Sequence, residues 1–328
     1  MRNFLALLLM AIISAATGVD SFAAENPSSK LSKPFANGKF ALESGDVVAF
    51  LGGTDVAAAQ HTGHLETLLT AKYRDSKIRF RNFGWEGDTV FSQPRDIGFP
   101  TLKILMERER VSVIVLQFGR MESLGGRDGL PEFVAAYEKF LNECVQQTRR
   151  ILLVTPPPFE KSSSPLPDLS AHNSDLAEYA KAIRKIARQH ELPLVDLFGE
   201  LSGLNHHERL TENGLQLTTR GQAMVARAFV REIGFGKIGE RAGKLDENGS
   251  WRDADFERLR GAIIKKNEVW FNYWRPQNWA FLGGDRTNQP SSRDHRDSNI
   301  RWFPQEMEKF VPLIEAKERE INELAKKL

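Results

Sequence analysis

The stretch VVAFLGGTD at residues 47–55 decides the fold. An apolar run gives way to two glycines, and the hydroxyl of Thr54 follows directly. The run predicts a buried strand, and the glycines predict a sharp turn at its carboxyl end. An α/β enzyme that acts by hydrolysis would hold its nucleophile at this place. Thr54 is therefore the first candidate catalytic residue, and Asp55 beside it is a candidate binding residue.

Apolar runs of strand length recur along the chain and alternate with amphipathic segments. Strands are expected at 47–51, 78–82, 111–118, 151–155 and 192–197, and helices at 63–73, 130–148, 173–190 and 220–233. Because the strands are apolar throughout, they predict a parallel sheet that is covered on both faces. The expected fold class is α/β, a three-layer α/β/α sandwich spanning residues 41–234.

The composition changes after residue 234. Residues 235–250 are rich in glycine and charge and are interpreted as a linker. Residues 251–328 contain five of the six tryptophans and are expected to be a helical extension that packs on the α/β domain. Its helices are expected up to Tyr273 and over 304–328, with an irregular polar loop over 278–299.

The amino end has the pattern of a secretory signal. Arg2 precedes an apolar stretch at 4–16, and cleavage is expected after Ala23. Signal peptide 1–23 and linker 24–40 would leave a secreted or periplasmic protein without a membrane span. The formal net charge of +2 gives no electrostatic reason to expect nucleic acid as a partner.

Metals, cofactors and thiol chemistry are not predicted. The single cysteine, Cys144, continues an apolar helical stripe and is interpreted as a core residue. His61 and His64 have helical spacing but no evident third ligand. No residue is therefore assigned to a metal or cofactor.

Four blocks of the chain resemble the SGNH/GDSL hydrolase family. They are residues 50–54, 81–89, 118–123 and 210–218, in the family's order and spacing. The resemblance implies a flavodoxin-like parallel sheet, esterase or lipase ancestry directed in many members at acylated carbohydrates, and an oxyanion role for Gly87. The tail, at 266–268 and 274–278, resembles an extension carried by a bacterial subgroup of the family.

The chain departs from the family's pattern where the chemistry is done. Met121 replaces the usual oxyanion Asn, and Asn213 and Gln216 replace the usual Asp and His. Gln216 cannot accept a proton, Asn213 cannot stabilise an imidazolium, and the methyl group of Thr54 crowds its hydroxyl. The leading hypothesis is an impaired or lost esterase that keeps a crevice for a polar, glycan-type ligand around these residues.

Two alternative sources of the missing catalytic or binding groups stay open. His295, oriented by Asp294 or Asp297, would serve as a base if its loop folded back over the sheet; otherwise the loop is solvated. Asp55, Asp88 and Glu122 each follow a strand, and together they would bind sugar hydroxyls or a hard cation. The alternatives are that Asp88 caps a nearby helix and that Asp55 closes its own turn.

Aromatic and polar residues of the second block and the tail complete the candidate site. Trp85 and the tail tryptophans would form a sugar-stacking platform, although such stripes are more often core. Arg275 and Asn278 are candidate polar contributors if the tail covers the crevice. Two competing functions remain: an active hydrolase using Thr54 and His295, and an assembly module that docks a partner protein. The oligomeric state is left open.

Overall fold

The computed structural model describes residues 33–203 and 209–328. The predicted signal peptide, most of the predicted linker 24–40, and His206 and His207 lie outside the described residues. Leu31–Leu328 form one compact unit. No helix in the described ranges has both the length and the apolar run that crossing a bilayer requires.

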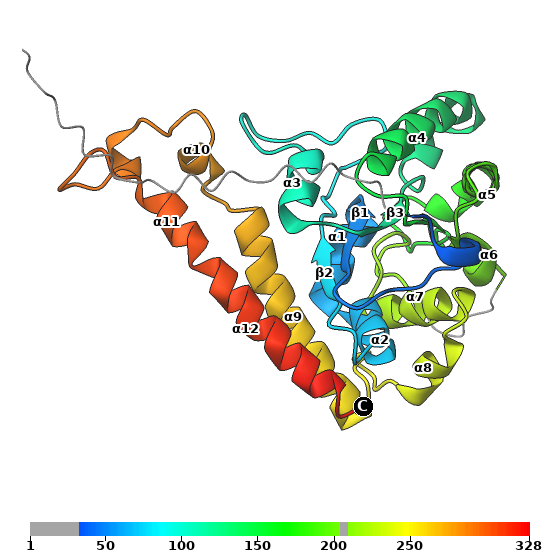
Figure 1. Cartoon of the computed structure of the whole chain (residues 1–328). Helices are drawn as coiled ribbons and strands as arrows, with labels where there is room; N and C mark the ends of the chain where they lie inside the picture. Colours follow the sequence, from blue (N-terminus) through cyan, green and yellow to red (C-terminus); the bar gives the residue numbers. More distant parts are fainter. Residues whose placement is uncertain (1–32, 204–208) are drawn as a thin grey trace, which may run out of the picture. The chain divides into compact units, whose positions relative to one another are not determined.

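A parallel sheet with the order β2-β1-β3-β4-β5 forms the centre of this unit (Figure 1). This strand order is the flavodoxin-like one, whose ligand crevice lies outside the carboxyl ends of the strands. The predicted α/β sandwich with a parallel sheet is confirmed. The strands are β1 (Val47–Gly52), β2 (Arg79–Asn82), β3 (Val113–Gln117), β4 (Ile151–Thr155) and β5 (Leu194–Asp196).

Helices connect the strands and continue beyond them (Figure 1). Those of the α/β part are α1 (Thr54–Thr62), α2 (His64–Lys72), α3 (Leu102–Glu109), α4 (Leu130–Val145), α5 (Asn173–Gln189), α6 (Leu197–Leu201), α7 (Thr219–Glu232) and α8 (Gly236–Arg241). Those of the tail are α9 (Ala254–Trp274), α10 (Trp279–Leu282), α11 (Trp302–Glu308) and α12 (Phe310–Ala325).

Alternate strand residues enter two hydrophobic cores, as the pleat of a strand requires. Val48 belongs to the core that α2, α7 and α8 cover, whereas Ala49 belongs to the core that α3, α4 and α5 cover. Helix α9 contributes to both. Its Leu259 lies in the first core and its Trp270 in the second, so the helix passes from one face of the sheet to the other.

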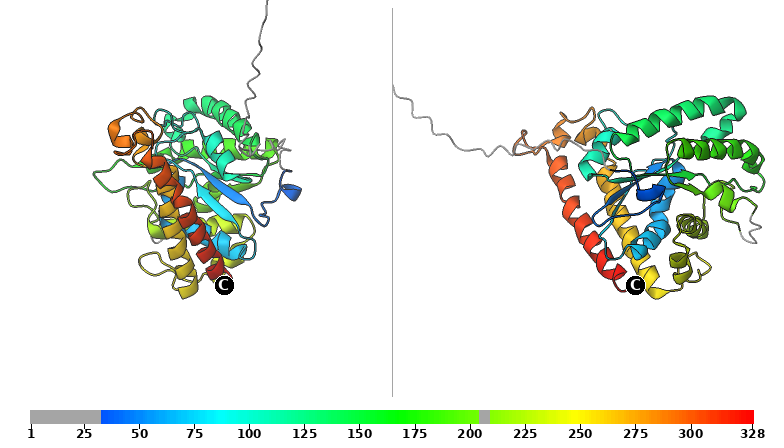
Figure 2. Two further views of the ribbon diagram at one scale, coloured as in Figure 1. Left: turned by 60° about the vertical axis from the view of Figure 1, so that its left-hand side comes forward. Right: turned by 45° about the vertical axis from the view of Figure 1, so that its right-hand side comes forward.

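Helix α9 runs past β2 and bonds to it through side chains. Lys266 Nζ donates to the carbonyl of Phe80 at 3.2 Å, and Trp270 Nε1 donates to the carbonyl of Asn82 at 3.0 Å. Helix α12 lies alongside α9 in every view (Figures 1 and 2). The tail therefore packs directly against the α/β part.

Buried charges join the tail to the α/β part. Lys266 is 1% exposed, and its ammonium lies 2.7 Å from the carboxylate of Glu66 on α2. Arg81 of β2, 4% exposed, binds Glu109 at 2.8 Å and Glu318 of α12 at 2.5 Å. Each buried charge thus has an opposite partner, which offsets part of the cost of removing it from water.

The secondary structure departs from the expectation in several places. Helices α1, α3 and α6 were not expected; α1 is rich in alanine and lacks a long apolar stripe, and α6 begins at Leu197, the last residue of the strand expected over 192–197. Residues 235–250, expected as a linker, contain α8. The loop expected over 278–299 contains α10. The single helix expected over 304–328 is divided into α11 and α12, because Pro312 lacks an N–H and its ring clashes with the carbonyl four residues earlier.

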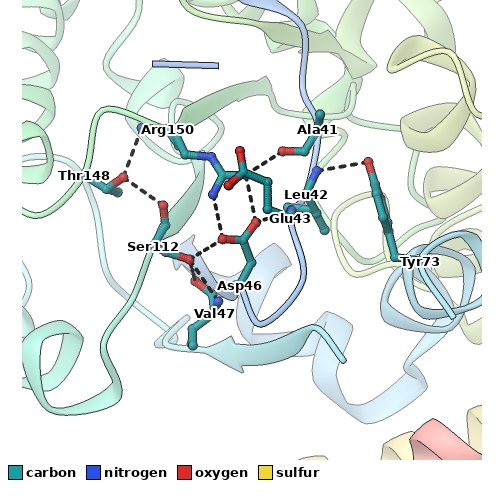
Figure 3. Close-up of polar contacts among 9 residues, drawn as sticks. All are labelled: Ala41, Leu42, Glu43, Asp46, Val47, Tyr73, Ser112, Thr148 and Arg150. Atoms are coloured by element: carbon teal, nitrogen blue, oxygen red, sulfur yellow. Dashed lines mark hydrogen bonds and ion pairs between the residues drawn. The ribbon is translucent and has the colours of Figure 1, made fainter. Parts of the chain in front are cut away.

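A satisfied polar cluster lies at the amino ends of the strands, opposite the predicted crevice (Figure 3). Arg150, just before β4, donates to both carboxylate oxygens of Asp46, just before β1, at 2.6 and 2.8 Å. Ser112, just before β3, donates to Asp46 at 2.8 Å and accepts from the N–H of Val47 at 3.0 Å. The cluster holds three strand starts together.

Candidate functional site

Thr54 lies at the turn between β1 and α1. The strand ends at Gly52, Gly53 follows, and Thr54 is the first residue of the helix. A side chain at position 53 would meet the carbonyl of Asp88 at 2.5 Å, so only glycine allows the two loops to lie this close. Thr54 is half-buried, and its hydroxyl makes no hydrogen bond to any described residue.

A pocket opens beside Thr54 at the carboxyl ends of β1 and β3. It gathers residues from the first, second, third and last sequence blocks, and five of them were predicted: Thr54, Asp55, Asp88, Met121 and Glu122. Met121 is 38% exposed at its rim. The other lining residues are Gly53, Gln117, Phe118, Gly119, Arg120, Pro156 and Leu215.

Asp55 and Asp88 each bind an arginine. Asp55 accepts from Arg120 at 2.8 Å, and Asp88 accepts from both terminal nitrogens of Arg95 at 2.7 Å. Burial raises the pKa of Asp88 above its ordinary range despite this partner. Asp88 does not cap a helix: the next helix, α3, is capped by Thr101. Asp55 forms an ion pair with Arg120 instead of closing its own turn.

Glu122 is held by main-chain donors. Its carboxylate oxygens accept from the N–H groups of Val90 and Gly119, both at 2.8 Å. The side chain is buried, and burial raises its pKa, although the N–H donors act in the opposite sense. The three carboxylates all line one pocket, but each already has a partner. Among the described residues no group of His, Cys, Asp and Glu forms a metal site.

The last block forms a turn in which neither Asn213 nor Gln216 lines the pocket. Asn213 Oδ1 accepts from the N–H groups of Leu215 and Gln216, at 3.1 and 2.7 Å. Gln216 is exposed and does not line the pocket, whereas Leu215 does. The two residues at the family's Asp and His positions thus lie in a turn that is ordered by Asn213 itself.

The comparison with protein families agrees with this fold. The GDSL-like lipase/acylhydrolase family matches residues 46–224. The chain belongs to this family. Axe2, an acetylxylan esterase from Geobacillus stearothermophilus, is 20% identical, with a TM-score of 0.47 over 60% of this chain and 97% of that one. The acetyl xylan esterase AlAXEase is 19% identical, with a TM-score of 0.44 over 56% and 96%. No curated protein matches the chain.

The second block of this GDSL-like chain carries a packed aromatic side chain. Gly87 is exposed with φ of +84°, a conformation that glycine adopts without strain. Trp85, two residues earlier, has the guanidinium groups of Arg95 and Arg275 over its ring, at 4.3 and 3.7 Å from the centroid. Arg275 also binds Glu86 at 2.6 Å. The structure therefore packs Trp85 instead of leaving it as an open sugar platform.

The tail residues predicted for the site lie outside the pocket lining. Asn278 immediately precedes α10, and Arg275 is engaged with Glu86 and Trp85. His295 has a side chain that is 76% exposed, and its Nδ1 lies 3.9 Å from a carboxylate oxygen of Asp294. The loop between α10 and α11 that carries His295 lies at the outer end of the α9–α12 pair (Figure 1). The structure does not bring His295 to Thr54.

Sequence reasoning missed Arg120 and Gln117. Arg120 is 4% exposed and donates to Asp55, to the carbonyl of Leu215 at 2.9 Å and to the carbonyl of Pro158 at 3.0 Å. An arginine directly after a fully apolar strand and a glycine was the available signal. Gln117 ends β3 in the pocket, and its amide makes no hydrogen bond within the described residues.

Proposed function

We propose that this GDSL-like chain binds a polar, glycan-type ligand at the carboxyl ends of β1 and β3 and has lost ordinary ester turnover. The observation that carries the proposal is the composition of the pocket at Thr54. In the described part of the chain no imidazole or amine lines it, and its carboxylates are bound to Arg120, Arg95 and main-chain N–H groups.

A threonine hydroxyl needs a base within hydrogen-bond reach to attack an ester. Each carboxylate here is already an acceptor in an internal bond, so a proton taken from Thr54 would disturb an arrangement that holds two loops together. Met121 in addition offers no hydrogen bond to a developing oxyanion. Loss of the nucleophile or the histidine in a serine protease lowers turnover about a million-fold, which sets the scale of the expected deficit.

Binding is supported by the polar groups that remain free. The hydroxyl of Thr54 and the amide of Gln117 point to no partner in the described ranges, so they are available to ligand hydroxyls. Further pockets adjoin along the same side of the sheet through Pro157 and Leu217, with Glu160, Asn173 and Ser174 beyond them. The outer pocket, with Glu160, Asn173 and Ser174 in its lining, offers polar groups to a hydroxyl-rich chain. The predicted signal peptide would place such binding outside the cytoplasm.

The proposal is tested on the mature full chain with two assays. Hydrolysis of p-nitrophenyl acetate and acetylated xylo-oligosaccharides is expected to be at background and unchanged in Thr54→Ala. Oligosaccharide binding, from an array and then by calorimetry, is expected to be lost in Met121→Trp, which blocks the rim. Leu313→Trp on α12, 55% exposed and outside the pocket, is the matched control.

Turnover that Thr54→Ala abolishes would overturn the binding-only function. Because His206 and His207 lie outside the described residues, His206→Ala and His207→Ala are then compared to find the base. Silence in both assays would favour the third hypothesis, a partner-docking module.

A further inference from the structure

A second cavity adjoins the crevice, and one residue of the tail lines it. Its volume is about 60 Å³, and its lining comes mainly from α1, α2, α7, β1 and β3, with Asn267 of α9. Asp55 and Gln117 line both this cavity and the pocket at Thr54, so the two spaces share a rim. We propose that the cavity receives a primary alcohol, the hydroxymethyl arm of a hexose unit, and so selects hexose over pentose units. This inference rests on the proposed glycan-binding function.

The cavity descends along one face of α1. Asp55, Val56, Ala59 and Gln60 line it, which is the spacing of a single helical face. The N–H of the Asn267 side chain donates to the carbonyl of Gln60 at 3.1 Å. Asn267, part of the tail motif seen in the sequence, therefore contributes to the wall of the cavity.

Gln60 is a buried lining residue whose side-chain oxygen lacks a hydrogen-bond donor. It is 3% exposed, its Nε2 donates to the carbonyl of Ala57 at 2.9 Å, and its Oε1 has no partner. A buried acceptor without a donor destabilises the protein, so the cavity favours a ligand group that donates a hydrogen bond.

The bond from Gln60 to Ala57 fixes how deep that acceptor lies. The side chain leans back toward the start of the helix, so its amide lies near the level of residue 57, two residues below Asp55. At 1.5 Å per residue this is roughly 3 Å below the rim. A hydroxymethyl arm on a sugar ring that lies in the crevice has the length to reach it.

The rest of the lining is mostly apolar, with Phe50, Val115 and Phe229 among its residues, and it favours an uncharged group. Gln117 and Gln222 add two amides that make no hydrogen bond within the described residues, and each offers both donors and an acceptor. The carboxylates in the lining are those of Asp55 and Glu66, and they are paired with Arg120 and Lys266. A charged ligand group would enter without a counter-ion at considerable cost, whereas a hydroxyl both donates and accepts.

The volume limits the size of the group. An engineered cavity of about 150 Å³ in T4 lysozyme holds benzene, so one of this size holds roughly two or three heavy atoms. The carbon and oxygen of a hydroxymethyl arm match that volume.

The test compares methyl β-glucoside with methyl β-xyloside, which differ by this arm alone. On the full mature chain, calorimetry is expected to give the glucoside at least about tenfold tighter binding. Gln60→Met keeps the volume and removes the acceptor; it is expected to bring the ratio below about twofold while the thermal midpoint stays equal or rises. Equal affinity of the two glycosides for the unmutated chain would overturn the inference and leave the proposed function intact.

Cavity filling gives a second, independent measurement. Ala59→Leu is expected to abolish glucoside binding and leave xyloside binding within about twofold, whereas Ala58→Leu, its half-buried neighbour outside the lining, is expected to leave both unchanged. Equal weakening of both ligands by Ala59→Leu would overturn the inference.

If neither glycoside binds, the proposed function fails, and ethylene glycol is titrated against the methyl signals of Ala59 and Ala226. Shifts there would support the alcohol site alone, and their absence would overturn it.

Discussion

Arg120 donates to Asp55 at 2.8 Å and thereby ties the end of β3 to the first turn of α1. The same guanidinium bonds to carbonyls of Pro158 and Leu215, so a single buried side chain holds three loops around Thr54. Its Nε has no partner within the described residues.

Arg120→Met is expected to lower the free energy of unfolding by about 3 kcal/mol, because the Asp55 carboxylate and two carbonyls lose their donor in a mostly dry site. Urea denaturation measures the change. The matched control is Arg258→Ala, which breaks an exposed pair with Asp255, and it should cost less than about 0.5 kcal/mol. A loss for Arg120→Met as small as that of the control would mean that the loops are held by packing.

His64 should make stability depend on pH. Burial lowers its pKa from 6.5 to about 4, and its Nε2 lies 2.9 Å from the carbonyl of Gly249. Between these pH values the unfolded chain binds a proton that the folded chain does not. The contribution of neutral His64 to the free energy of unfolding is therefore complete above pH 6.5. It falls by on the order of 3 kcal/mol as the pH falls toward 4.

Denaturant midpoints from pH 8 to pH 4 measure this effect. His64→Gln, which keeps a donor for Gly249, should remove most of the fall that the unmutated chain shows below pH 6.5. Identical curves for the two proteins would assign the fall to other groups.

The buried pair of Lys266 and Glu66 should behave as a unit. Lys266→Met alone, or Glu66→Gln alone, leaves a buried charge or donor unmatched and is expected to cost about 3–5 kcal/mol. The double variant should recover a large part of that loss, since a well-packed neutral pair can replace a buried ion pair. Additive losses in this double-mutant cycle would contradict direct coupling of α9 to α2.

Restoring the family's residues tests whether chemistry is lost at the side chains alone. Because position 216 is exposed and does not line the pocket at Thr54, we expect Thr54→Ser, Met121→Asn, Asn213→Asp and Gln216→His together to leave p-nitrophenyl acetate turnover near background. A rise of about a hundredfold that depends on Gln216→His would show that the side chains alone were lost. Asn213→Asp keeps an oxygen that can accept from Leu215 and Gln216, so the turn should survive. The set without Gln216→His is the control and should stay at background; turnover by that control would show that another base is in reach.

The sheet could be predicted because its information is local. Most of the strands are short apolar runs, and β4 matches its expected bounds of 151–155. The exception is β2, Arg79–Asn82, in which three of the four residues are polar. Helix α1 escaped notice because alanines and polar residues give no clear stripe, and its position is set by the glycine contact with Asp88.

The positions of the site residues, but not their partners, could be predicted for a related reason. Family spacing brought Thr54, Met121 and Glu122 to one pocket, because strand ends meet at one side of a parallel sheet. Family spacing did not predict which partner each carboxylate has, because Arg120 and Arg95 reach Asp55 and Asp88 through tertiary packing. The placement of His295 was likewise a matter of how a long loop packs, which no local pattern encodes.

The hydrogen bonds from Lys266 and Trp270 to β2 have a consequence for solubility. β2 is the outermost strand, and its free side presents carbonyls that another chain could pair with. The tail occupies those acceptors with side-chain donors and takes the place of a sixth strand. A chain that ended before α9 would expose an open strand to its neighbours, so aggregation by strand addition is the hazard that this extension guards against.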